Sequence, residues 1–450
     1  MTWKANPRMI KCTTGIVNCG RTECNMSTKL HYFHVNGLGE PIRYILHYAG
    51  EKFEDVRYDP KSWPIKNVKD TLPFGQLPLY EEGNRTLNQS LAIARYLASK
   101  TNLLPSDPWE QALLDAVVFN IYDFWSKVTV YIKEQDPVKK QAIRKEILDE
   151  SVEFFLSRFE RELKKNNGYF GRKLTWADFV FVGIIEAANL FLDTEIEKKY
   201  PTIQTLVQKI RNLPGVKEYI ATRKPYSVMI IYSTAIVDSE LVSDCKMSKK
   251  LYYFNRNGLA EFTRYILHYS GEKFEDIRYD RKKWPIKDVK DKLPYGQVPI
   301  YQEGDRTLNQ SIAIARYVAS KTGLLPSDPW DQAVLDAIVF TLYDFWSTKV
   351  LAFIKEQDPM KKHAIKKEIE DEAVDFYFSR FEKELKKNNG HFAGRLTWAD
   401  FVLVGMVEAA NFYLSIEVEK NYPTIQNLVQ KITNLPGVKE YIATREPYSL

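Results

Sequence analysis

The sequence predicts a duplicated protein in which each copy joins a small mixed α/β domain to a larger all-helical domain. Two observations support this fold class. Long stretches recur, since Arg43–Tyr48 returns as Arg264–Tyr269 and Leu104–Trp109 returns as Leu325–Trp330. The first part of each copy also alternates between strand and helix patterns, whereas the rest has only helical periodicity. Because solenoid repeats span about 20–50 residues, an offset of 221 residues between Arg43 and Arg264 indicates a duplicated pair of domains.

One residue is gained between the two copies. The offset is 221 residues at Arg43 and 222 residues at Leu174, which returns as Leu396, and the extra residue lies just after Trp346. We expect a leader without fixed structure at 1–26, the first pair of domains at 27–104 and 105–227, a linker at 228–247, and the second pair at 248–325 and 326–450. The linker is apolar around Ile230, which leaves open whether it packs against a module or forms a short strand.

The first domain of each copy reads as βαβ followed by ββα. In the first copy we expect a strand at 29–35, a helix at 38–49, a strand at 55–58, a hairpin formed by 77–80 and 86–88, and a helix from Ser90 to Leu97. Gly83 and Asn84 supply the turn of the hairpin. Ser90 is the expected N-cap of the last helix, because its hydroxyl oxygen can accept a hydrogen bond from a free backbone N–H group.

The second domain is predicted to be entirely helical. An apolar stripe with helical spacing runs through Leu148, Val152, Phe155, Leu156, Phe159 and Leu163. Thr175 and Asp178 have the spacing of a capping box and predict the start of a further helix. Pro214 and Gly215 predict a break before the last helix.

Composition excludes several classes of function. The chain has 64 Lys and Arg against 58 Asp and Glu, a net charge of +6 over 450 residues, which is too weak to indicate nucleic-acid binding. No apolar run has the length of a membrane span, and residues 1–26 lack the apolar core of a signal peptide. The four cysteines, Cys12, Cys19, Cys24 and Cys245, lie outside the repeats and have irregular spacing. We therefore expect a cytoplasmic protein with no disulfide framework and no metal site.

Four motifs, at consistent spacing, make the chain resemble the cytosolic glutathione transferases, most closely the insect-like sigma class. They are Lys29–Phe33, Leu72–Pro78, Asn88–Leu97 and Leu174–Asp178, and the resemblance covers nearly all of both copies. It implies a thioredoxin-like βαβββα domain followed by a helical domain in each copy. It also implies glutathione as co-substrate, with no metal required.

The resemblance implies that Tyr32 and Tyr253 are catalytic. In similar enzymes this tyrosine donates its hydroxyl hydrogen to the glutathione sulfur. A thiol with a pKa of about 8.5 must fall by roughly two units to be mostly thiolate at pH 7, which corresponds to ~2.7 kcal/mol. One hydrogen bond to a charged acceptor contributes ~1.5–3 kcal/mol. A single neutral phenol is thus nearly sufficient.

The resemblance also assigns the groups that bind the tripeptide. Gln89 and Ser90 would hold the γ-glutamyl carboxylate, and a cis bond before Pro78 would present the Leu77 backbone to the cysteinyl unit. Trp63, Lys69 and Gln76 would surround the glycyl end, with Lys66 as a substitute for Lys69. Asp123 would cross to the neighbouring module's site. The counterparts are Gln310, Ser311, Val298, Pro299, Trp284, Lys290, Gln297 and Asp344.

Three functions remain open at this point. The first is attack of the glutathione thiolate on hydrophobic electrophiles, in a pocket lined by Phe33, Tyr122, Trp125 and their counterparts Phe254, Tyr343 and Trp346, with lipid hydroperoxide reduction as a further activity. The second is a prostaglandin D-type isomerase. Leu38 and Leu259 replace the arginine that some sigma enzymes have at this position, which leaves the isomerase subtype open. The third is a non-catalytic crystallin-like or ligand-binding protein.

Family members are symmetric dimers, so the two modules are expected to pair with each other as an internal pseudo-dimer, or between chains as a homodimer. A flexible linker of about 20 residues spans ~25 Å, which allows internal pairing. A thiol-disulfide oxidoreductase is disfavoured because no cysteine lies near Tyr32 or Tyr253.

Overall fold

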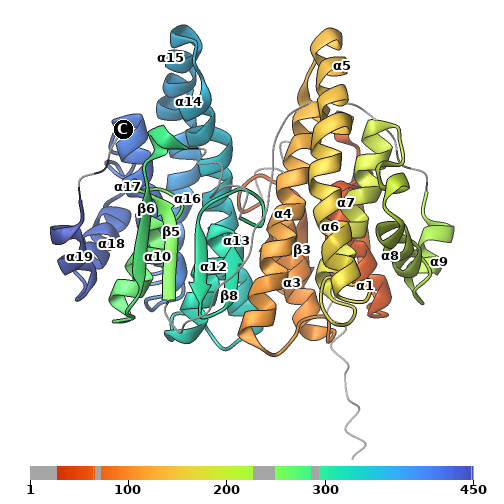
Figure 1. The fold of residues 1–450 in the computed structure, drawn as a ribbon, viewed down its shortest axis with the longest axis horizontal. Helices are drawn as coiled ribbons and strands as arrows, with labels where there is room; N and C mark the ends of the chain where they lie inside the picture. Colours follow the sequence, from red (N-terminus) through yellow and green to blue (C-terminus); the bar gives the residue numbers. More distant parts are fainter. Residues whose placement is uncertain are drawn as a thin grey trace, which may run out of the picture.

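The computed structural model describes residues 28–63, 65, 72–224, 226, 249–284, 293–446 and 448. These residues form two modules that stand side by side, each with a four-stranded sheet and a set of long helices (Figure 1). The predicted leader at 1–26 and the predicted linker at 228–247 lie outside the described residues.

Each sheet is mixed and has the strand order expected for a βαβ unit followed by a hairpin. In the first module the order is β2-β1-β3-β4, with β1 parallel to β2 and antiparallel to β3. The second module repeats this order as β6-β5-β7-β8. The first module's elements here are β1 Thr28–Phe33, α1 Glu40–Tyr48, β2 Glu54–Tyr58, β3 Leu79–Glu82, β4 Arg85–Asn88 and α3 Ser90–Lys100. Their counterparts are β5 Lys249–Phe254, α10 Glu261–Tyr269, β6 Glu275–Tyr279, β7 Ile300–Glu303, β8 Arg306–Asn309 and α12 Ser311–Lys321.

Short turns flank the two strands that come first in each sheet. A 3-10 turn, η1 Gly37–Gly39, precedes α1, so the predicted helix at 38–49 begins slightly later than expected. The turns η2 Pro60–Ser62 and η5 Arg281–Lys283 follow β2 and β6. Because β1 runs parallel to β2 and β5 runs parallel to β6, these turns lie near the strand ends that carry the two predicted catalytic tyrosines.

The second domain of each module is helical, as predicted. The first module contains α4 Pro108–Lys133, α5 Pro137–Glu146, η3 Ile147–Ser151, α6 Val152–Lys165, α7 Trp176–Leu192, η4 Ile196–Lys199, α8 Pro201–Arg211 and α9 Val216–Thr222. The second contains α13 Pro329–Phe345, η6 Trp346–Val350, α14 Leu351–Lys355, α15 Pro359–Glu368, η7 Ile369–Ala373, α16 Val374–Lys387, α17 Trp398–Leu414, α18 Pro423–Thr433 and α19 Val438–Thr444. The predicted capping box is present, because Thr175 and Asp178 satisfy each other's backbone at the start of α7.

Helix α1 packs directly on α7 and joins the two domains of the first module. The approach is so close that a Cβ atom on Gly183 of α7 would lie 2.8 Å from the Pro41 ring. In the second module, a Cβ atom on Gly405 would lie 2.9 Å from Phe262. Any larger residue at either glycine would therefore push the domains apart.

The residue gained after Trp346 has a local structural consequence. Helix α4 is continuous in the first module, whereas its counterpart is interrupted by the π-helical turn η6 between α13 and α14. A one-residue insertion is accommodated in a helix by widening one turn. The position predicted for the insertion is confirmed, and the widened turn begins at Trp346 itself.

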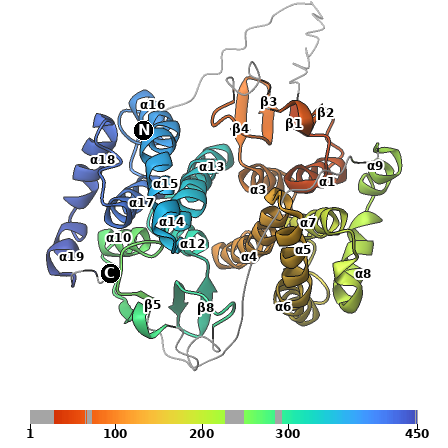
Figure 2. The same cartoon turned by 90° about the horizontal axis from the view of Figure 1, so that it is seen from above.

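The modules pack through reciprocal contacts. Helix α3 lies against α13 and α12 lies against α4. Tyr96 meets Trp330 edge to face with ring centroids 4.9 Å apart, and Trp109 meets Tyr317 at the same distance. Seen from above, the two sheets lie at opposite corners with these helices between them (Figure 2). Such reciprocity is the mark of an approximate twofold relation.

Tyr295 of the second module contacts more aromatic rings of the opposite module than its counterpart Phe74 does. The Tyr295 ring lies within 6.4 Å of three rings of α6, those of Phe154, Phe155 and Phe159. The matching ring of Phe74 contacts Phe381 at 5.6 Å. The loop before each cis proline is thus held by the helical domain of the other module.

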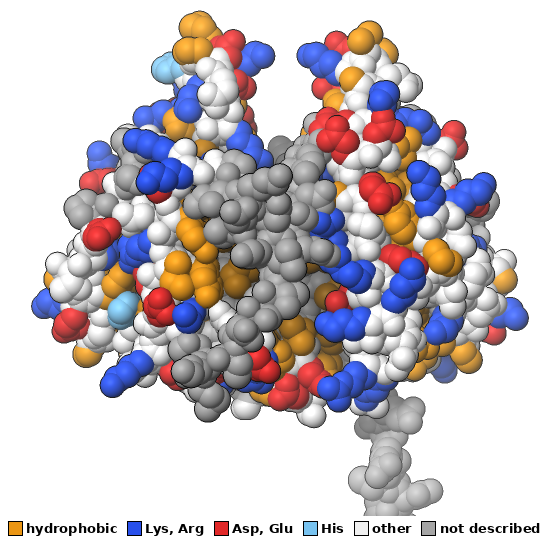
Figure 3. Space-filling view, in the orientation of Figure 1, with side chains coloured by type: hydrophobic (Ala, Val, Ile, Leu, Met, Phe, Trp, Pro, Cys, Tyr) orange, Lys and Arg blue, Asp and Glu red, His pale blue; other side chains and the backbone are white. Residues whose placement is uncertain are grey.

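The surface carries mixed charges. On the face shown in Figure 3, basic and acidic side chains alternate over both modules. Among the described residues, one helical run, Pro329–Lys355, is long and apolar enough to cross a membrane by composition, and half of its most apolar window is buried against the rest of the protein.

Candidate functional site

Tyr32 lies near the end of β1, with its ring packed against the loop that follows. The side chain is 7% exposed, and a Cβ atom on Gly39 would lie 2.4 Å from the ring. The hydroxyl oxygen accepts a hydrogen bond from the backbone N–H of Leu38 at 3.1 Å. This bond uses a lone pair of the oxygen, so the phenol hydrogen remains available for another acceptor.

The phenol is neutral near pH 7. Burial raises the pKa of Tyr32 to about 12, while the N–H of Leu38 and the charge of Arg43 act in the opposite direction. A neutral hydroxyl held by a backbone N–H is suited to donate a hydrogen bond to an anion.

Arg43 fixes the loop around Tyr32. Its guanidinium is fully buried and donates to the carbonyl oxygens of Phe33 and Val35, at 3.2 and 2.9 Å. It also forms an ion pair with Asp55 at 3.0 Å, and its Cζ lies 5.7 Å from the centre of the Tyr32 ring. Sequence reasoning found Arg43 only as part of a repeated stretch and assigned it no role, although a recurring arginine in an apolar helix was a usable signal.

The second module repeats this arrangement around Tyr253. The hydroxyl oxygen of Tyr253 accepts a hydrogen bond from the backbone N–H of Leu259 at 3.3 Å. Burial raises the pKa of Tyr253 to about 12, and the neighbouring hydroxyl of Tyr413 adds to the increase. The N–H of Leu259 and the charges of Arg264 and Arg281 act in the opposite direction.

Gln89 and Ser90 lie where β4 passes into α3. Gln89 has a positive φ of 68°, and Gln310 repeats it with 70°. The prediction that Ser90 is the N-cap is wrong, since Ser90 is the first helical residue and its hydroxyl pairs with that of Tyr122. Gln89, which has the positive φ, occupies the cap position instead, one residue earlier.

The amide of Gln89 crosses to the other module. Its Nε2 donates to Asp344 at 2.8 Å and to Thr341 at 3.2 Å. Burial raises the pKa of Asp344 to about 6, opposed by the hydrogen bond from Gln89 and the charge of Lys133. The carboxylate is therefore mostly ionised at pH 7.

The reciprocal contact joins Gln310 to the first module. Its Nε2 donates to Asp123 at 2.8 Å and to Asn120 at 3.0 Å. Burial raises the pKa of Asp123, while the hydrogen bond from Gln310 and the charge of Lys127 lower it. Each predicted crossing carboxylate thus lies beside the predicted glutamine of the opposite module.

Both predicted cis bonds are present, at Leu77–Pro78 and Val298–Pro299. Leu77 lies two residues before β3, which pairs with β1 through Leu79 and His31. The Leu77 backbone therefore lies close to the end of β1.

Trp63 lies beside the end of β1 as well. Its ring meets Phe33 edge to face at 5.3 Å, and Trp284 meets Phe254 at the same distance. Gln76 is half-buried and Gln297 is exposed. Lys66, Lys69 and Lys290 lie outside the described residues.

Among the residues predicted to line the electrophile pocket, Phe33 and Phe254 lie beside the two predicted catalytic tyrosines. Phe33 adjoins the Tyr32 ring at 5.4 Å, and Trp125 lies 6.1 Å from Phe191 of α7. In the second module, Phe254 adjoins Tyr253 at 5.3 Å and Trp346 lies 5.9 Å from Tyr413. The hydroxyl of Tyr122, also predicted to line this pocket, pairs with the hydroxyl of Ser90.

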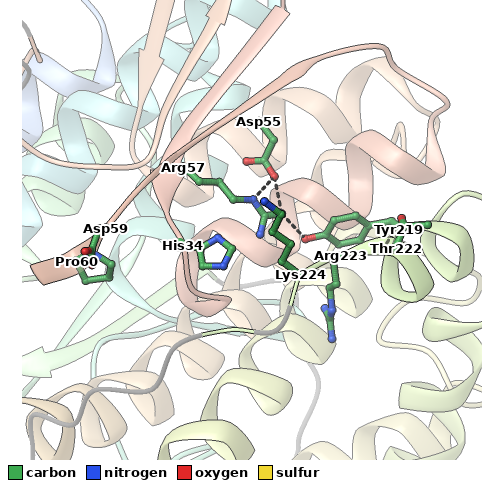
Figure 4. A pocket seen from close by; sticks show the side chains of 9 residues that line it. All are labelled: His34, Asp55, Arg57, Asp59, Pro60, Tyr219, Thr222, Arg223 and Lys224. Carbon is green, nitrogen blue, oxygen red and sulfur yellow. Dashed lines mark hydrogen bonds and ion pairs between the residues drawn. The ribbon is translucent and has the colours of Figure 1, made fainter. Parts of the chain in front are cut away.

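A large cavity of about 730 Å³ lies elsewhere, between β2 and the end of α9. Figure 4 shows its polar walls, where Arg57 pairs with Asp55 and donates to Tyr219 at 3.1 Å. Tyr32 does not line it. Over the described ranges, no cluster of three or more histidine, cysteine or acidic side chains could hold a metal ion. Cys12, Cys19, Cys24 and Cys245 lie outside those ranges.

Comparison with known families assigns both halves of each module. The model of the glutathione S-transferase N-terminal domain matches residues 28–99 and 247–320. The model of the glutathione S-transferase C-terminal domain matches residues 122–223 and 344–445.

Single relatives correspond to one module. A glutathione S-transferase of Anopheles gambiae is 37% identical over 196 residues, which are 43% of this chain and 96% of the relative. The hematopoietic prostaglandin D synthase of Gallus gallus is 36% identical over 195 residues, with the same coverage of 43% and 96%. The solved structure of prostaglandin synthase D of Nilaparvata lugens is 35% identical, covers 44% of this chain and 99% of that chain, and gives a TM-score of 0.42.

The predictions of the family and of the duplicated fold are confirmed. Each module has the thioredoxin-like sheet followed by a helical domain. The chain therefore belongs to the glutathione S-transferase family, with the N-terminal and the C-terminal domain each present twice.

Proposed function

We propose that the protein is a sigma-type glutathione transferase in which Tyr32 and Tyr253 each stabilise a glutathione thiolate. The observation that carries the proposal is the state of the two hydroxyls. Each hydroxyl oxygen accepts a hydrogen bond from a backbone N–H, at 3.1 Å for Tyr32 and 3.3 Å for Tyr253, and each phenol has a pKa of about 12. Each therefore keeps a hydrogen to donate to sulfur at neutral pH. The thiolate is the nucleophile, so lowering the thiol pKa supplies the reactivity.

The remaining contacts fit the rest of the tripeptide. Gln89 and Ser90, at the start of α3, would hold the γ-glutamyl carboxylate, because free N–H groups at a helix start favour an anion. Asp344 would pair with the ammonium group of the same unit. The Leu77 backbone would pair with the cysteinyl unit, and Trp63, Lys69 and Gln76 would face the glycyl carboxylate. The second module would use the counterparts of these residues, with Asp123 as its crossing carboxylate.

The reaction follows from this placement. The glutathione sulfur attacks an electrophilic carbon, a bond from sulfur to carbon forms, and a leaving group such as chloride departs with its electron pair. The phenol returns to a free hydroxyl when the neutral thioether leaves. Reduction of a lipid hydroperoxide would use the same thiolate, which takes the terminal oxygen and releases the lipid alcohol. A second glutathione would then form the disulfide and release water.

We also propose that the modules pair within one chain, in the cytoplasm. The reciprocal contacts of Gln89 with Asp344 and of Gln310 with Asp123 support this pairing, since each site would be incomplete without the other module. A tether of this length gives an effective concentration of roughly millimolar. Light scattering at low concentration should give a mass near 52.5 kDa. A mass near two chains would argue for pairing between chains.

Conjugation of chlorodinitrobenzene tests the assigned tyrosines. Tyr32→Phe and Tyr253→Phe keep the ring that packs on the following loop and remove only the hydroxyl. Each single variant should keep part of the activity, and the double variant should lose most of it. Full activity in the double variant, with an unchanged circular dichroism spectrum, would reject the role of both tyrosines.

A prostaglandin D-type isomerase is the second candidate. The 36% identity to a hematopoietic prostaglandin D synthase favours it. It would use the same thiolate on an endoperoxide, so the product formed from such a substrate distinguishes the two activities. A non-catalytic ligand-binding role would predict glutathione binding without turnover of either substrate.

A further inference from the structure

The two modules differ at two aligned positions whose second-module residues lie near Tyr253. Pro60 and Arg281 are counterparts in the turns that follow β2 and β6, and Phe191 and Tyr413 are counterparts in α7 and α17. In both cases the second module has the polar or charged residue. The surroundings of Tyr253 therefore differ in chemistry from those of Tyr32.

Arg281 lies at the edge of the second site. Its Cζ is 5.3 Å from the centre of the Phe254 ring, which itself adjoins the Tyr253 ring at 5.3 Å. The side chain is exposed, and no acidic group among the described residues forms an ion pair with it. Its positive charge is therefore available to a ligand that lies over Phe254.

Tyr413 supplies a second hydroxyl to the same site. Its ring lies 5.9 Å from Trp346. A Cβ atom on Gly258 would lie 3.9 Å from Trp346 and 3.2 Å from the Tyr253 hydroxyl, so Trp346 borders that hydroxyl. The Tyr413 hydroxyl is also close enough to raise the pKa of Tyr253. In the first module the corresponding pair is Trp125 and Phe191, which has no polar atom on its ring.

Two further donors near the second site lack partners. The indole N–H of Trp346 is buried and has no hydrogen-bond acceptor within the described part of the chain. The Nε of Arg256, three residues after Tyr253, is in the same state, whereas the first module has Val35 at this position. Buried donors of this kind are costly unless an acceptor is supplied.

We propose, resting on the proposed glutathione function, that the two sites select different electrophiles. The second module takes electrophiles that carry a carboxylate, which Arg281 and Tyr413 recognise, and the first module takes uncharged electrophiles. The carboxylate serves only for recognition, and the bond changes are those of the conjugation described above. The duplication thus gives one chain two complementary substrate ranges.

Single-site variants allow each module to be measured alone. Tyr253→Phe leaves the first site active, and Tyr32→Phe leaves the second. Each is assayed with chlorodinitrobenzoate and with its methyl ester, which share a leaving group and differ in charge. The ester is intrinsically more reactive, so the quantity compared is the acid-to-ester ratio of kcat/KM. We expect this ratio to be about fivefold higher at the second site, the size typical of an exposed ion pair.

Two reciprocal pairs of variants identify the residues responsible. Arg281→Gln should lower the ratio at the second site to that of the first, and Pro60→Arg should raise the ratio at the first. Tyr413→Phe should lower the ratio at the second site, with Phe191→Tyr as its reciprocal. The preference should also shrink at 1 M salt, where the screening length is about 3 Å. A substitution that only destabilised the fold would leave the acid-to-ester ratio unchanged.

Equal ratios at the two sites would overturn the inference while leaving the proposed function intact. Absence of conjugation by both single-site variants would instead reject the proposed function. Calorimetry with the two glutathione conjugates then still decides the inference, because the acid conjugate should bind the second site more tightly than the ester conjugate does. Equal binding of both conjugates by each variant would overturn it without any use of turnover.

Discussion

Asp344 provides a direct test of whether each module completes the site of the other. It belongs to α13 of the second module, yet its carboxylate accepts a hydrogen bond from Gln89 of the first module at 2.8 Å. Replacing it by asparagine keeps the shape and removes the charge. The prediction is that Asp344→Asn weakens glutathione binding at the first module's site and leaves the second site unaffected.

The magnitude follows from the lost charge. Burial raises the pKa of Asp344 to about 6, so the group is mostly ionised at pH 7 and can pair with the ammonium of the γ-glutamyl unit. A hydrogen bond to a charged group contributes ~1.5–3 kcal/mol, which corresponds to roughly 10- to 100-fold in affinity. Because the charged form is the one that binds, affinity at this site should also fall as the pH drops below about 6.

The assay is the KM for glutathione in the two single-site backgrounds. In Tyr253→Phe, where only the first site works, adding Asp344→Asn should raise the KM at least tenfold. In Tyr32→Phe it should change little. Asp123→Asn is the mirror control and should affect only the second site. If Asp344→Asn raised the KM in the Tyr32→Phe background, or in neither background, the reasoning about crossing carboxylates would be refuted.

Three further predictions concern the phenol, the contact between modules and the helix start. Since Tyr32 and Tyr253 both have a pKa of about 12, activity should rise with pH through the thiol ionisation and not fall again below pH 9. In a pH–rate profile, adding Tyr32→Phe to the Tyr253→Phe background should move the rise of the residual activity toward about 8.5. Tyr295→Ala should lower the free energy of unfolding in urea by roughly 2–3 kcal/mol, more than Phe74→Ala, since its ring contacts three rings of α6; an unchanged midpoint would contradict this. Asp178→Ala should cost about 2–4 kcal/mol, because the carboxylate accepts three hydrogen bonds within the fold, and Asp178→Asn should cost less in the same measurement.

Features set by neighbouring residues could be predicted well. The capping box of Thr175 and Asp178 starts α7 as expected, because its two partners are three residues apart. The insertion after Trp346 follows from the change in offset between the two copies, and it appears as the turn η6. The prediction of an N-cap at Ser90 was wrong, because Ser90 is already the first helical residue and its hydroxyl pairs with that of Tyr122, which lies 32 residues further along the chain.

For the candidate site, the family resemblance supplied the roles that are proposed for Tyr32, Gln89 and Asp123. It did not indicate that Arg43 would order the loop around the phenol. Nor did it single out Tyr413, which lies 160 residues after Tyr253 in the chain and raises the pKa of Tyr253 only once the protein is folded. Such contacts carry no periodic signal in the sequence.

The amino-acid sequence alone determined the duplication, the order of domains and the pairs of matching residues, because these depend on recurrence and on local hydrophobic periodicity. Tertiary structure alone decided which carboxylate faces which glutamine and which charges surround each phenol. The physical reason is distance along the chain. Gln89 and Asp344 are brought to 2.8 Å only when α3 packs on α13, and that packing depends on the complementary shape of two whole modules.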